Sequence, residues 1–346
     1  MTKKPPQFID LFCGCGGLAL GFKKAGFRSV FAVDSDPTAC KTYEANFNHN
    51  VFCGDIASLR KIPVDADMII GGPPCQGFSP LGKMSPGDVA LQNHVVLNKL
   101  WIEYLRVVDQ VNPKCFVIEN VPEFFHSREF VKLTKEIEKR KFNFTCDVLD
   151  GSRFGIPQNR KRGFLIAAKE VQPSLPAPTD ERRTVKDAIG DLPLQPTGKD
   201  WHIGRNPTST SLERYKCVPP GGNRFDLMRK RPDITPKCWM NKPTGSTDVF
   251  GRLKWDEPAL TIRTEFYKPE KGRYLHPAAQ RPITHREAAR LQTFPDGFKF
   301  IGSKIQVARM IGNAVPPKLS YHVAVAVKKT IFRYNSIHTH EELLAH

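Results

Sequence analysis

The sequence predicts an α/β fold, in which a mostly parallel sheet carries helices on both faces and is accompanied by a smaller, loop-rich domain. Short apolar runs at 8–12, 29–34, 66–72 and 115–120 have the length of buried strands and lead into Gly, Asp, Asn or Cys. Segments with helical spacing lie between them, at 38–47 and 98–111. This alternation is typical of parallel sheets, which bind ligands at the carboxyl ends of their strands.

The second domain is predicted from a change in composition after about residue 171. Between 171 and 285 lie 15 of the 29 prolines, and helical periodicity is weak there. Helical spacing returns at 284–294 and 320–332, so we expect the chain to re-enter the first domain. The predicted organisation is a first domain over 1–188 and 300–335, a second domain over 189–285, a hinge region over 286–299 and a disordered tail over 336–346.

The net charge, the cysteines and the lengths of the apolar runs favour some classes of function and argue against others. Lys and Arg outnumber Asp and Glu by 52 to 35, and a charge of +17 favours a polyanionic partner such as nucleic acid, with a solvated basic surface as the alternative. Nine scattered cysteines without paired CxxC units argue against both a disulfide framework and a structural zinc site. No apolar run approaches the ~20 residues that span a bilayer, and the start lacks a signal-peptide pattern, so we expect a cytoplasmic protein without a membrane partner.

The first strand leads into a glycine-rich turn, DLFCGCGG (10–17). Gly14, Gly16 and Ala19 match a GxGxx[G/A] dinucleotide-binding fingerprint, a turn that serves many adenosine ligands, and Asp34 ends the next strand about 20 residues on. A carboxylate at that point can accept hydrogen bonds from both ribose hydroxyls, and Asp55 after the third strand could accept from an adenine amine. A plain tight turn and ordinary helix-capping aspartates are the alternatives.

The segment GGPPCQGFSP (71–80) follows the strand around 66–72. Pro73 and Pro74 stiffen the exit from the strand, and Cys75 then stands near a predicted helix start, where backbone dipoles lower a thiol pKa. A lone cysteine is more often inert core, but this context favours a nucleophile. The stretch Gln76 to Val95 has the composition of a mobile lid.

Two further segments carry charged side chains at strand ends. Glu119 follows four apolar residues, so burial should raise its pKa and make it a proton donor near neutral pH. Arg160 and Arg162 share one face of the strand in QNRKRGFLIAA (158–168). Arg162 is expected to point into the same pocket as Glu119, and Arg160 is grouped with it or is structural; an exposed basic edge strand is the alternative for both.

Taken together, these segments resemble the bacterial-type DNA (cytosine-5)-methyltransferase family over roughly residues 8–170 and 284–325. The eight blocks, in the family's order, are DLFCGCGG (10–17), VDSD (33–36), GDI (54–56), GPPCQGFS (72–79), ENV (119–121), QNRKR (158–162), REAARLQTFPD (286–296) and GNAVPP (312–317). Two positions depart from the family pattern: Ser35 replaces an aromatic residue, and Leu97 replaces an arginine.

The resemblance implies a Rossmann-like methyltransferase sheet, S-adenosylmethionine as cofactor and duplex DNA as partner. It implies that Cys75 is the nucleophile, that Glu119 is the acid facing cytosine and that Arg162 binds the base. The cofactor-binding residues carried over are Phe12, Gly14, Gly16, Gly17, Asp34, Asp55, Ile56, Pro74, Asn98, Leu100, Asn313 and Ala314. Residues 189–285 would be the target-recognition domain, and the rest would be catalytic.

The expected function is methylation of carbon 5 of a flipped cytosine in a specific duplex sequence through a Cys75 adduct. The protein would be prokaryotic, associated with the nucleoid through DNA, and paired in function with a restriction endonuclease that acts on the same site without contacting it. Three alternatives remain from the sequence: a tRNA cytosine-5 methyltransferase, a nicotinamide-linked oxidoreductase, and a non-catalytic DNA-binding relative. The last of these would be expected to lose Cys75 or Glu119, and both are present.

Overall fold

The structure is a computed structural model that describes residues 4–74, 100–241 and 244–332. The chain divides into two compact units. Unit 1 contains the residues up to Asp150, Lys161–Pro178 and the residues from Val315 on, and unit 2 contains Gly151–Arg160 and Thr179–Ala314. This division reflects how compactly the chain is packed. The boundaries predicted from the sequence separate a catalytic from a target-recognition domain, and they stay predictions.

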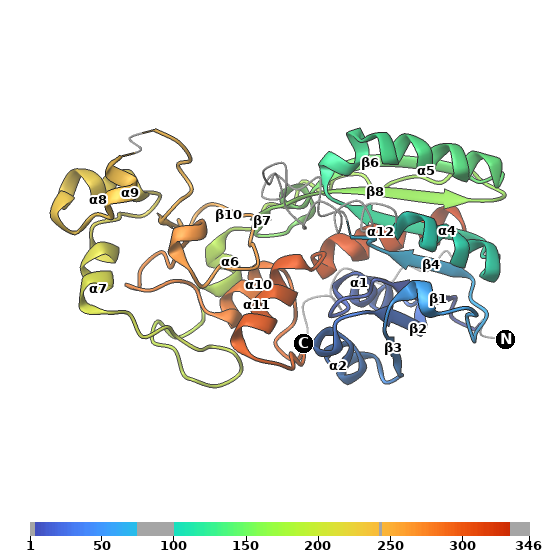
Figure 1. The fold of residues 1–346 in the computed structure, drawn as a ribbon, viewed down its shortest axis with the longest axis horizontal. Helices are drawn as coiled ribbons and strands as arrows, with labels where there is room; N and C mark the ends of the chain where they lie inside the picture. Colours follow the sequence, from blue (N-terminus) through green and yellow to red (C-terminus); the bar gives the residue numbers. More distant parts are fainter. Residues whose placement is uncertain (1–3, 75–99, 242–243, 333–346) are drawn as a thin grey trace. The chain divides into compact units, whose positions relative to one another are not determined.

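Unit 1 is built on a twisted sheet, in which seven strands are seen among the described residues (Figure 1). The strands are β1 (Gln7–Leu11), β2 (Arg28–Asp34), β3 (Val51–Cys53), β4 (Met68–Gly71), β5 (Cys115–Asn120), β6 (Asn143–Asp150) and β8 (Lys161–Ala168), in the spatial order β3-β2-β1-β4-β5-β8-β6. The pairs from β3 to β5 are parallel, and β8 pairs antiparallel with both β5 and β6. The predicted α/β fold with a mostly parallel sheet is confirmed.

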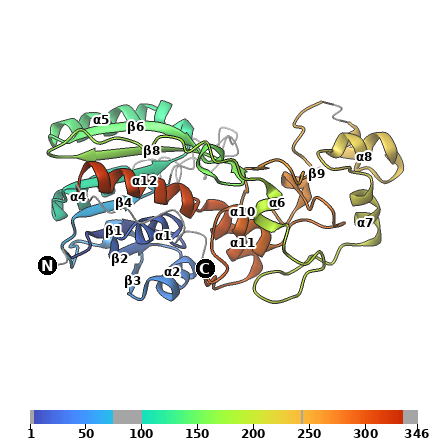
Figure 2. The ribbon, with the colours of Figure 1, turned by 180° about the vertical axis from the view of Figure 1, so that it is seen from behind.

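Helices cover both faces of this sheet, which is why its central strands are continuous apolar runs (Figure 2). α4 (Leu100–Val111) and α5 (Arg128–Lys139) pack on one face in a shared core, and α1 (Gly17–Lys24) and α12 (Pro317–Thr330) pack against each other. That contact depends on Gly21, because a Cβ there would lie 2.4 Å from the Tyr321 backbone nitrogen. No helix in the described part of the chain is both long and apolar enough to span a bilayer.

The remaining elements of unit 1 connect the strands. α2 (Pro37–Phe47) begins at Asp36, whose carboxylate accepts from the backbone nitrogens of Thr38 and Ala39 and so caps the helix. The 3₁₀ helix η1 (Ile56–Ser58) follows β3, and η4 (Pro122–His126) follows β5. Local capping chemistry therefore places each turn directly after a strand end.

Unit 2 has short elements joined by long loops. Its described helices are α6 (Val185–Ile189), α7 (Ser209–Lys216), α8 (Arg224–Lys230), α9 (Lys237–Met240), α10 (His285–Leu291) and α11 (Lys304–Asn313), with 3₁₀ turns η5 (Gly151–Phe154), η6 (Pro232–Ile234) and η7 (Pro269–Lys271). Two-residue β7 (Gln158–Asn159) pairs with β10 (Ala259–Leu260), and β9 (Gly251–Arg252) pairs with β11 (Arg273–Leu275). Tyr215, Leu227 and Phe250 belong to a small apolar core.

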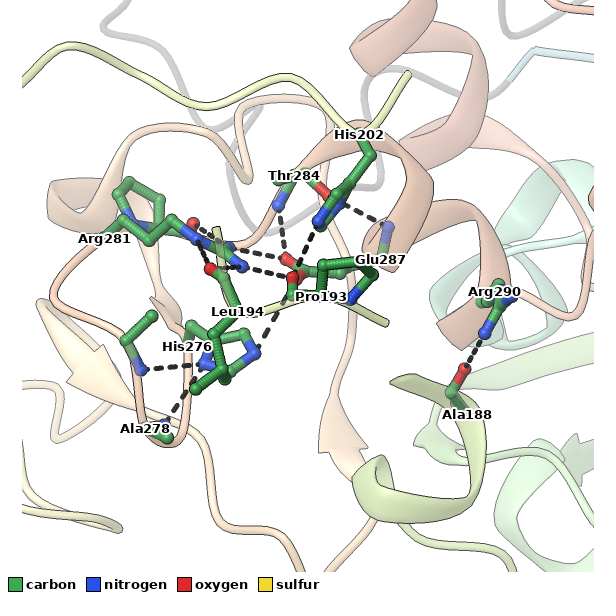
Figure 3. Close-up of polar contacts among 12 residues, drawn as sticks. Ala188, Pro193, Leu194, His202, His276, Ala278, Arg281, Thr284, Glu287 and Arg290 are labelled. Carbon is green, nitrogen blue, oxygen red and sulfur yellow. Dashed lines mark hydrogen bonds and ion pairs between the residues drawn. The ribbon is translucent and has the colours of Figure 1, made fainter. Parts of the chain in front are cut away.

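Unit 2 also contains a buried polar network at the start of α10 (Figure 3). Thr284 and Glu287 form a reciprocal capping box, and the fully buried Glu287 carboxylate accepts two hydrogen bonds from Arg281, at 2.8 and 2.7 Å. His202 Nδ1 lies 3.0 Å from the Thr284 hydroxyl. A bidentate pair of this kind offsets much of the cost of burying both charges.

His276 lies beside this network and is 1% exposed. Its Nδ1 accepts from the backbone nitrogens of Ala278 and Ala279, at 3.1 and 2.9 Å, and its Nε2 lies 3.6 Å from Glu287. Burial lowers the pKa of His276 to about 4, although the charge of Glu287 opposes that shift. The folded protein therefore holds this imidazole neutral across the range in which an unfolded histidine becomes protonated.

This difference predicts a pH-dependent stability. Because the unfolded chain binds the proton more tightly, the free energy of unfolding should fall as pH decreases from 6.5 to about 4, by up to about 3 kcal/mol. His276→Asn keeps an acceptor for the two backbone nitrogens but cannot titrate, so it should flatten that slope. Urea unfolding at several pH values measures the effect.

The exposed His126 provides the matched control. His126→Asn should leave the pH slope unchanged. A wild-type slope that persists in His276→Asn would show that another group causes the acid sensitivity.

Candidate active site

The carboxyl ends of the parallel strands gather the predicted site residues of unit 1 at one edge of the sheet. Phe12 follows β1, Asp34 ends β2, Asp55 follows β3 and Glu119 lies at the end of β5. Because β8 runs antiparallel to β5, its first residues, which include Arg162, reach the same edge. The topology thus brings together side chains that are up to 150 residues apart in sequence.

The glycine-rich turn after β1 has a backbone that favours glycine. Gly14 and Gly16 have φ of 52° and 92°, and Phe12 itself adopts a φ of 57°. A Cβ on Gly16 would lie 2.4 Å from the Phe47 ring, whereas nothing lies within 4 Å of a Cβ on Gly14. The turn is therefore packed tightly against α2 on one side and open at Gly14.

Asp34 holds this turn in place. One carboxylate oxygen accepts from the Gly14 nitrogen and the other from the Asp36 nitrogen, each at 2.8 Å. Burial raises the pKa of Asp34, and these backbone hydrogen bonds oppose the shift. A carboxylate in this setting gains from further hydroxyl donors, and the vicinal hydroxyls of a ribose supply two.

Asp10 lies buried below the turn and was not singled out by the sequence analysis. Both carboxyl oxygens are buried, and the Tyr43 hydroxyl, which is bonded to Ser29, is a polar group that acts on them. Burial raises the pKa of Asp10 well above its usual range, the charge of Asp34 raises it further, and the Tyr43 hydroxyl opposes the shift. Burial therefore disfavours the charged form of Asp10.

Asp55 and Ile56 form the next part of the edge. Asp55 is exposed, and its Oδ1 caps η1 by accepting from the Ala57 nitrogen at 2.9 Å. Ile56 is 3% exposed and belongs to the core under α4. An apolar floor beside an exposed acceptor suits the ring of a purine, so the open turn, Asp34 and this pair fit an adenosine-containing cofactor.

The other cofactor-binding residues of the prediction are spread over both units. Pro74 is half-buried after β4, and Leu100 begins α4 and packs against the core of unit 1. Asn98 lies outside the described residues. In unit 2, Asn313 is exposed at the end of α11 and Ala314 is half-buried.

Glu119 and Arg162 form a buried ion pair at the end of β5. Arg162 Nε lies 3.0 Å from Glu119 Oε1, and their side chains are 15% and 12% exposed. Burial lowers the pKa of Arg162, and the charge of Glu119 opposes this shift. A Cβ on Gly72 would lie 2.9 Å from Glu119 Oε2, so any larger residue at this position would crowd the Glu119 carboxyl group.

Asn120 positions the backbone that leads to Cys75. Its buried side-chain nitrogen donates to the Pro73 carbonyl at 3.0 Å, and its side-chain oxygen accepts from Val121 at 2.9 Å. Cys75 itself lies outside the described residues, as does the predicted lid from Gln76 to Val95. The sequence analysis assigned Asn120 no role, although its place in the ENV block was a signal.

Arg160 is fully buried in unit 2, where its guanidinium donates to the carbonyls of Ile262 and Gly312, at 3.0 and 2.8 Å. Gln158 is equally buried; it donates to Gln292 and accepts from the Ile262 nitrogen. These contacts tie residues 158–160 to three other segments of unit 2, around Ile262, Gln292 and Gly312. They favour the structural alternative for Arg160, and its catalytic role stays a prediction.

Unit 2 also contains a cavity of about 620 Å³. Arg153 and Arg182 line it, are exposed, and make no ion pair within the part of the chain that the structure describes. Lys254 pairs with Glu257 at 2.6 Å and Glu181 with Arg183 at 2.8 Å, whereas the exposed Asp180 adds a negative charge to the lining. The two arginines are thus available for an anionic partner.

Comparisons with known proteins identify the family of this chain. Residues 6–329 match the family described as C-5 cytosine-specific DNA methylase. The chain is 35% identical to the type II methyltransferase M1.HphI of Haemophilus parahaemolyticus over 93% of this chain and 86% of that protein. It is 32% identical to the type II methylase M.HgiDII of Herpetosiphon aurantiacus over 93% and 94%.

Solved structures share the fold. A protein encoded within an Escherichia coli prophage superposes with a TM-score of 0.72 at 25% identity, covering 95% of this chain and all of that chain. The Dnmt2 methyltransferase of S. pombe has a TM-score of 0.64 at 17% identity over 95% of this chain and all of its own, which shows the fold alone. The match to the family and to its type II members shows that this chain belongs to the C-5 cytosine-specific DNA methylase family and is a DNA methyltransferase.

Proposed function

We propose that the sheet edge of unit 1 binds S-adenosylmethionine and a cytosine flipped out of duplex DNA, and that Cys75, Glu119 and Arg162 carry the reaction. The observation that supports this most is the buried Glu119–Arg162 pair, 3.0 Å apart, at the same sheet edge as the glycine-rich turn. A guanidinium donates hydrogen bonds and a carboxyl group can accept them. Side by side, the two groups can therefore bind the carbonyl, ring nitrogen and amine on the polar edge of a pyrimidine.

The cofactor would lie along the turn after β1. Phe12 and the turn glycines Gly14, Gly16 and Gly17 would contact it, Asp34 would accept from the ribose hydroxyls, and Asp55 would accept from the adenine amine, with Ile56 under the ring. Pro74 and Leu100 would complete the pocket in unit 1, and the family resemblance adds Asn98, Asn313 and Ala314 as cofactor-binding residues. When bound, S-adenosylmethionine supplies an electrophilic methyl group.

The protein groups would activate cytosine in a fixed order. The Cys75 thiolate adds to carbon 6 while Glu119 provides a proton at ring nitrogen 3, and carbon 5 becomes nucleophilic enough to accept the methyl group. Arg162 holds the carbonyl oxygen of the base. A base then removes the carbon 5 proton, the Cys75 sulfur leaves with its electron pair as the proton on ring nitrogen 3 returns to Glu119, and the aromatic ring is restored.

Asn120 and Arg160 would act as positioning residues. Asn120 fixes Pro73, two residues before the nucleophile, and Arg160 fixes Gly312 next to Asn313. We also propose that the protein works in the cytoplasm on nucleoid DNA, and that a restriction endonuclease shares its target site without contacting it. Residues 189–285 would read the target sequence, with the arginines of the cavity contacting phosphates.

The chemical roles predict two graded losses of activity. Cys75→Ser should abolish transfer, because a hydroxyl cannot add to carbon 6 as a thiolate does. Glu119→Gln keeps the shape but lacks the proton, and should slow transfer by roughly 10²–10⁴-fold. Incorporation of tritiated methyl groups into duplex DNA, with tRNA as a second substrate, measures both.

Glu123 lies exposed on η4, four residues away, and Glu123→Gln is the matched control, expected to retain full activity. Activity of Cys75→Ser within about tenfold of wild type would remove Cys75 from the mechanism. Methylation of tRNA in place of DNA would support the tRNA alternative.

The cavity of unit 2 predicts a change in salt dependence. Replacing Arg153 and Arg182 together by Gln should weaken DNA binding and reduce the slope of log affinity against log salt by up to roughly 1.8, because two phosphate contacts are lost. Fluorescence anisotropy with duplex DNA at several salt concentrations measures the slope.

The double variant Lys132→Gln/Lys135→Gln removes the same charge from α5 and serves as the control. Its slope should match that of the wild type. Equal slopes for all three proteins would place the phosphate contacts outside this cavity.

A further inference from the structure

A hydrogen-bonded connection runs from α4 to the turn that carries Asp55 and Ile56. Arg106 Nη2 donates to the Ile56 carbonyl at 2.9 Å, and Gln110, one helical turn later, donates to the Arg60 carbonyl at 2.8 Å. Arg106 is itself fixed, because its Nε donates to Glu103 Oε2 on the same helix at 2.6 Å. One face of α4 therefore clamps the segment from 56 to 60.

The peptide unit between Ile56 and Ala57 is held from both sides. Its carbonyl accepts from Arg106, and its N–H donates to Asp55 Oδ1 at 2.9 Å. A peptide unit is planar, and its C=O and N–H point in opposite directions, so Arg106 and Asp55 bind opposite sides of one rigid peptide group. When Arg106 fixes the orientation of this peptide group, the N–H in turn fixes the position of Asp55 Oδ1.

Burial strengthens the hydrogen bond that Arg106 donates to the Ile56 carbonyl. Ile56 is 3% exposed, whereas Asp55 is exposed to solvent and has no ion pair within the described residues. The Arg106 side chain is 30% exposed and that of Glu103 is 25% exposed. A guanidinium that donates to a half-buried carbonyl makes a charge-assisted hydrogen bond, which is stronger than a neutral one.

We propose that Arg106 is a positioning residue that orients Asp55 for the exocyclic amine of the cofactor's purine, and so sets the preference for adenine. The proposal rests on the proposed function, in which Asp55 accepts from that amine. Arg106 acts only through the Ile56–Ala57 peptide. Loss of Arg106 should let the Asp55 carboxylate turn away, so that amine and carbonyl purines bind more equally.

The test compares two ligands that differ at the edge of the purine formed by carbon 6 and nitrogen 1. S-Adenosylhomocysteine has an amine on carbon 6 and an unprotonated nitrogen 1, whereas S-inosylhomocysteine has a carbonyl oxygen on carbon 6, which a carboxylate repels, and a proton on nitrogen 1. Isothermal titration calorimetry on the full-length protein should show that the wild type prefers the amine by at least about tenfold. Arg106→Met should reduce this ratio to about threefold or less, and Arg106→Lys, whose ammonium can donate to Ile56, should restore most of it.

A purely structural role for Arg106 would lower both affinities equally and leave the ratio unchanged, and that result would overturn the proposal. Arg140→Met is the matched control, since Arg140 on α5 pairs with Asp109 of α4 and does not touch the turn. It should keep the wild-type ratio. A falling ratio in Arg140→Met as well would also overturn the proposal, because the effect would then arise from α4 in general.

A further variant keeps the test valid if Arg106→Met fails to fold. Glu103→Gln leaves Arg106 in place but weakens its anchor, and should lower the ratio about two- to threefold. An unchanged ratio in a folded Glu103→Gln would count against the proposal. Failure of the wild type to bind S-adenosylhomocysteine would contradict the proposed function, whereas binding of both ligands with equal affinity by the wild type would contradict this inference alone.

Discussion

The antiparallel pairing of β8 with β5 is the constraint on which the site depends. In this register Asn120 faces Gly163 and Glu119 faces Phe164, so Arg162 emerges at the edge where the parallel strands end. A parallel β8 would carry Arg162 to the opposite edge of the sheet. Gly163 contributes as well, because a Cβ there would lie 2.0 Å from the Phe125 ring, which packs over the strand. The antiparallel direction of β8 therefore places Arg162 beside Glu119, which the parallel strands alone do not do.

Acidic side chains are buried at both ends of this sheet edge. The three buried acids differ in how they meet the cost of desolvation: burial raises the pKa of Asp10 and so disfavours its charged form, Asp34 accepts backbone hydrogen bonds, and Glu119 pairs with Arg162. The arrangement leaves negative charge beside the open glycine turn and a polar pair beside the strand end that leads to Cys75. The same principle operates in unit 2, where Arg281 satisfies Glu287 and His276 stays neutral. Desolvated groups with fixed partners keep their orientation, which is what binding two different substrates at one edge requires.

Much of the fold and part of the site could be predicted from the sequence. Apolar runs that end in polar residues predicted the strands and placed Asp34 and Glu119 at their ends, because that signal is local. Gln158 and Arg106 carried no such signal, and Asn120 carried only its place in the ENV block, since the three roles depend on backbone groups that are 104, 50 and 47 residues away in sequence. Asp10 was hidden by its apolar neighbours. The predicted roles of Cys75 and Asn98 still rest on the sequence and the family alone, because both residues lie outside the described part of the chain.

The central claim is that one sheet edge holds the cofactor and the flipped base together, and a structure of a trapped complex tests it most directly. A duplex with 5-fluorocytosine at the target position stops the reaction before the adduct breaks down, since fluorine cannot leave as a proton does. The account predicts a bond from Cys75 to carbon 6, Glu119 and Arg162 on the polar edge of the extruded base, and Asp34 on the ribose of S-adenosylhomocysteine. A target base that stays stacked in the duplex, or an adduct on another cysteine, would contradict it.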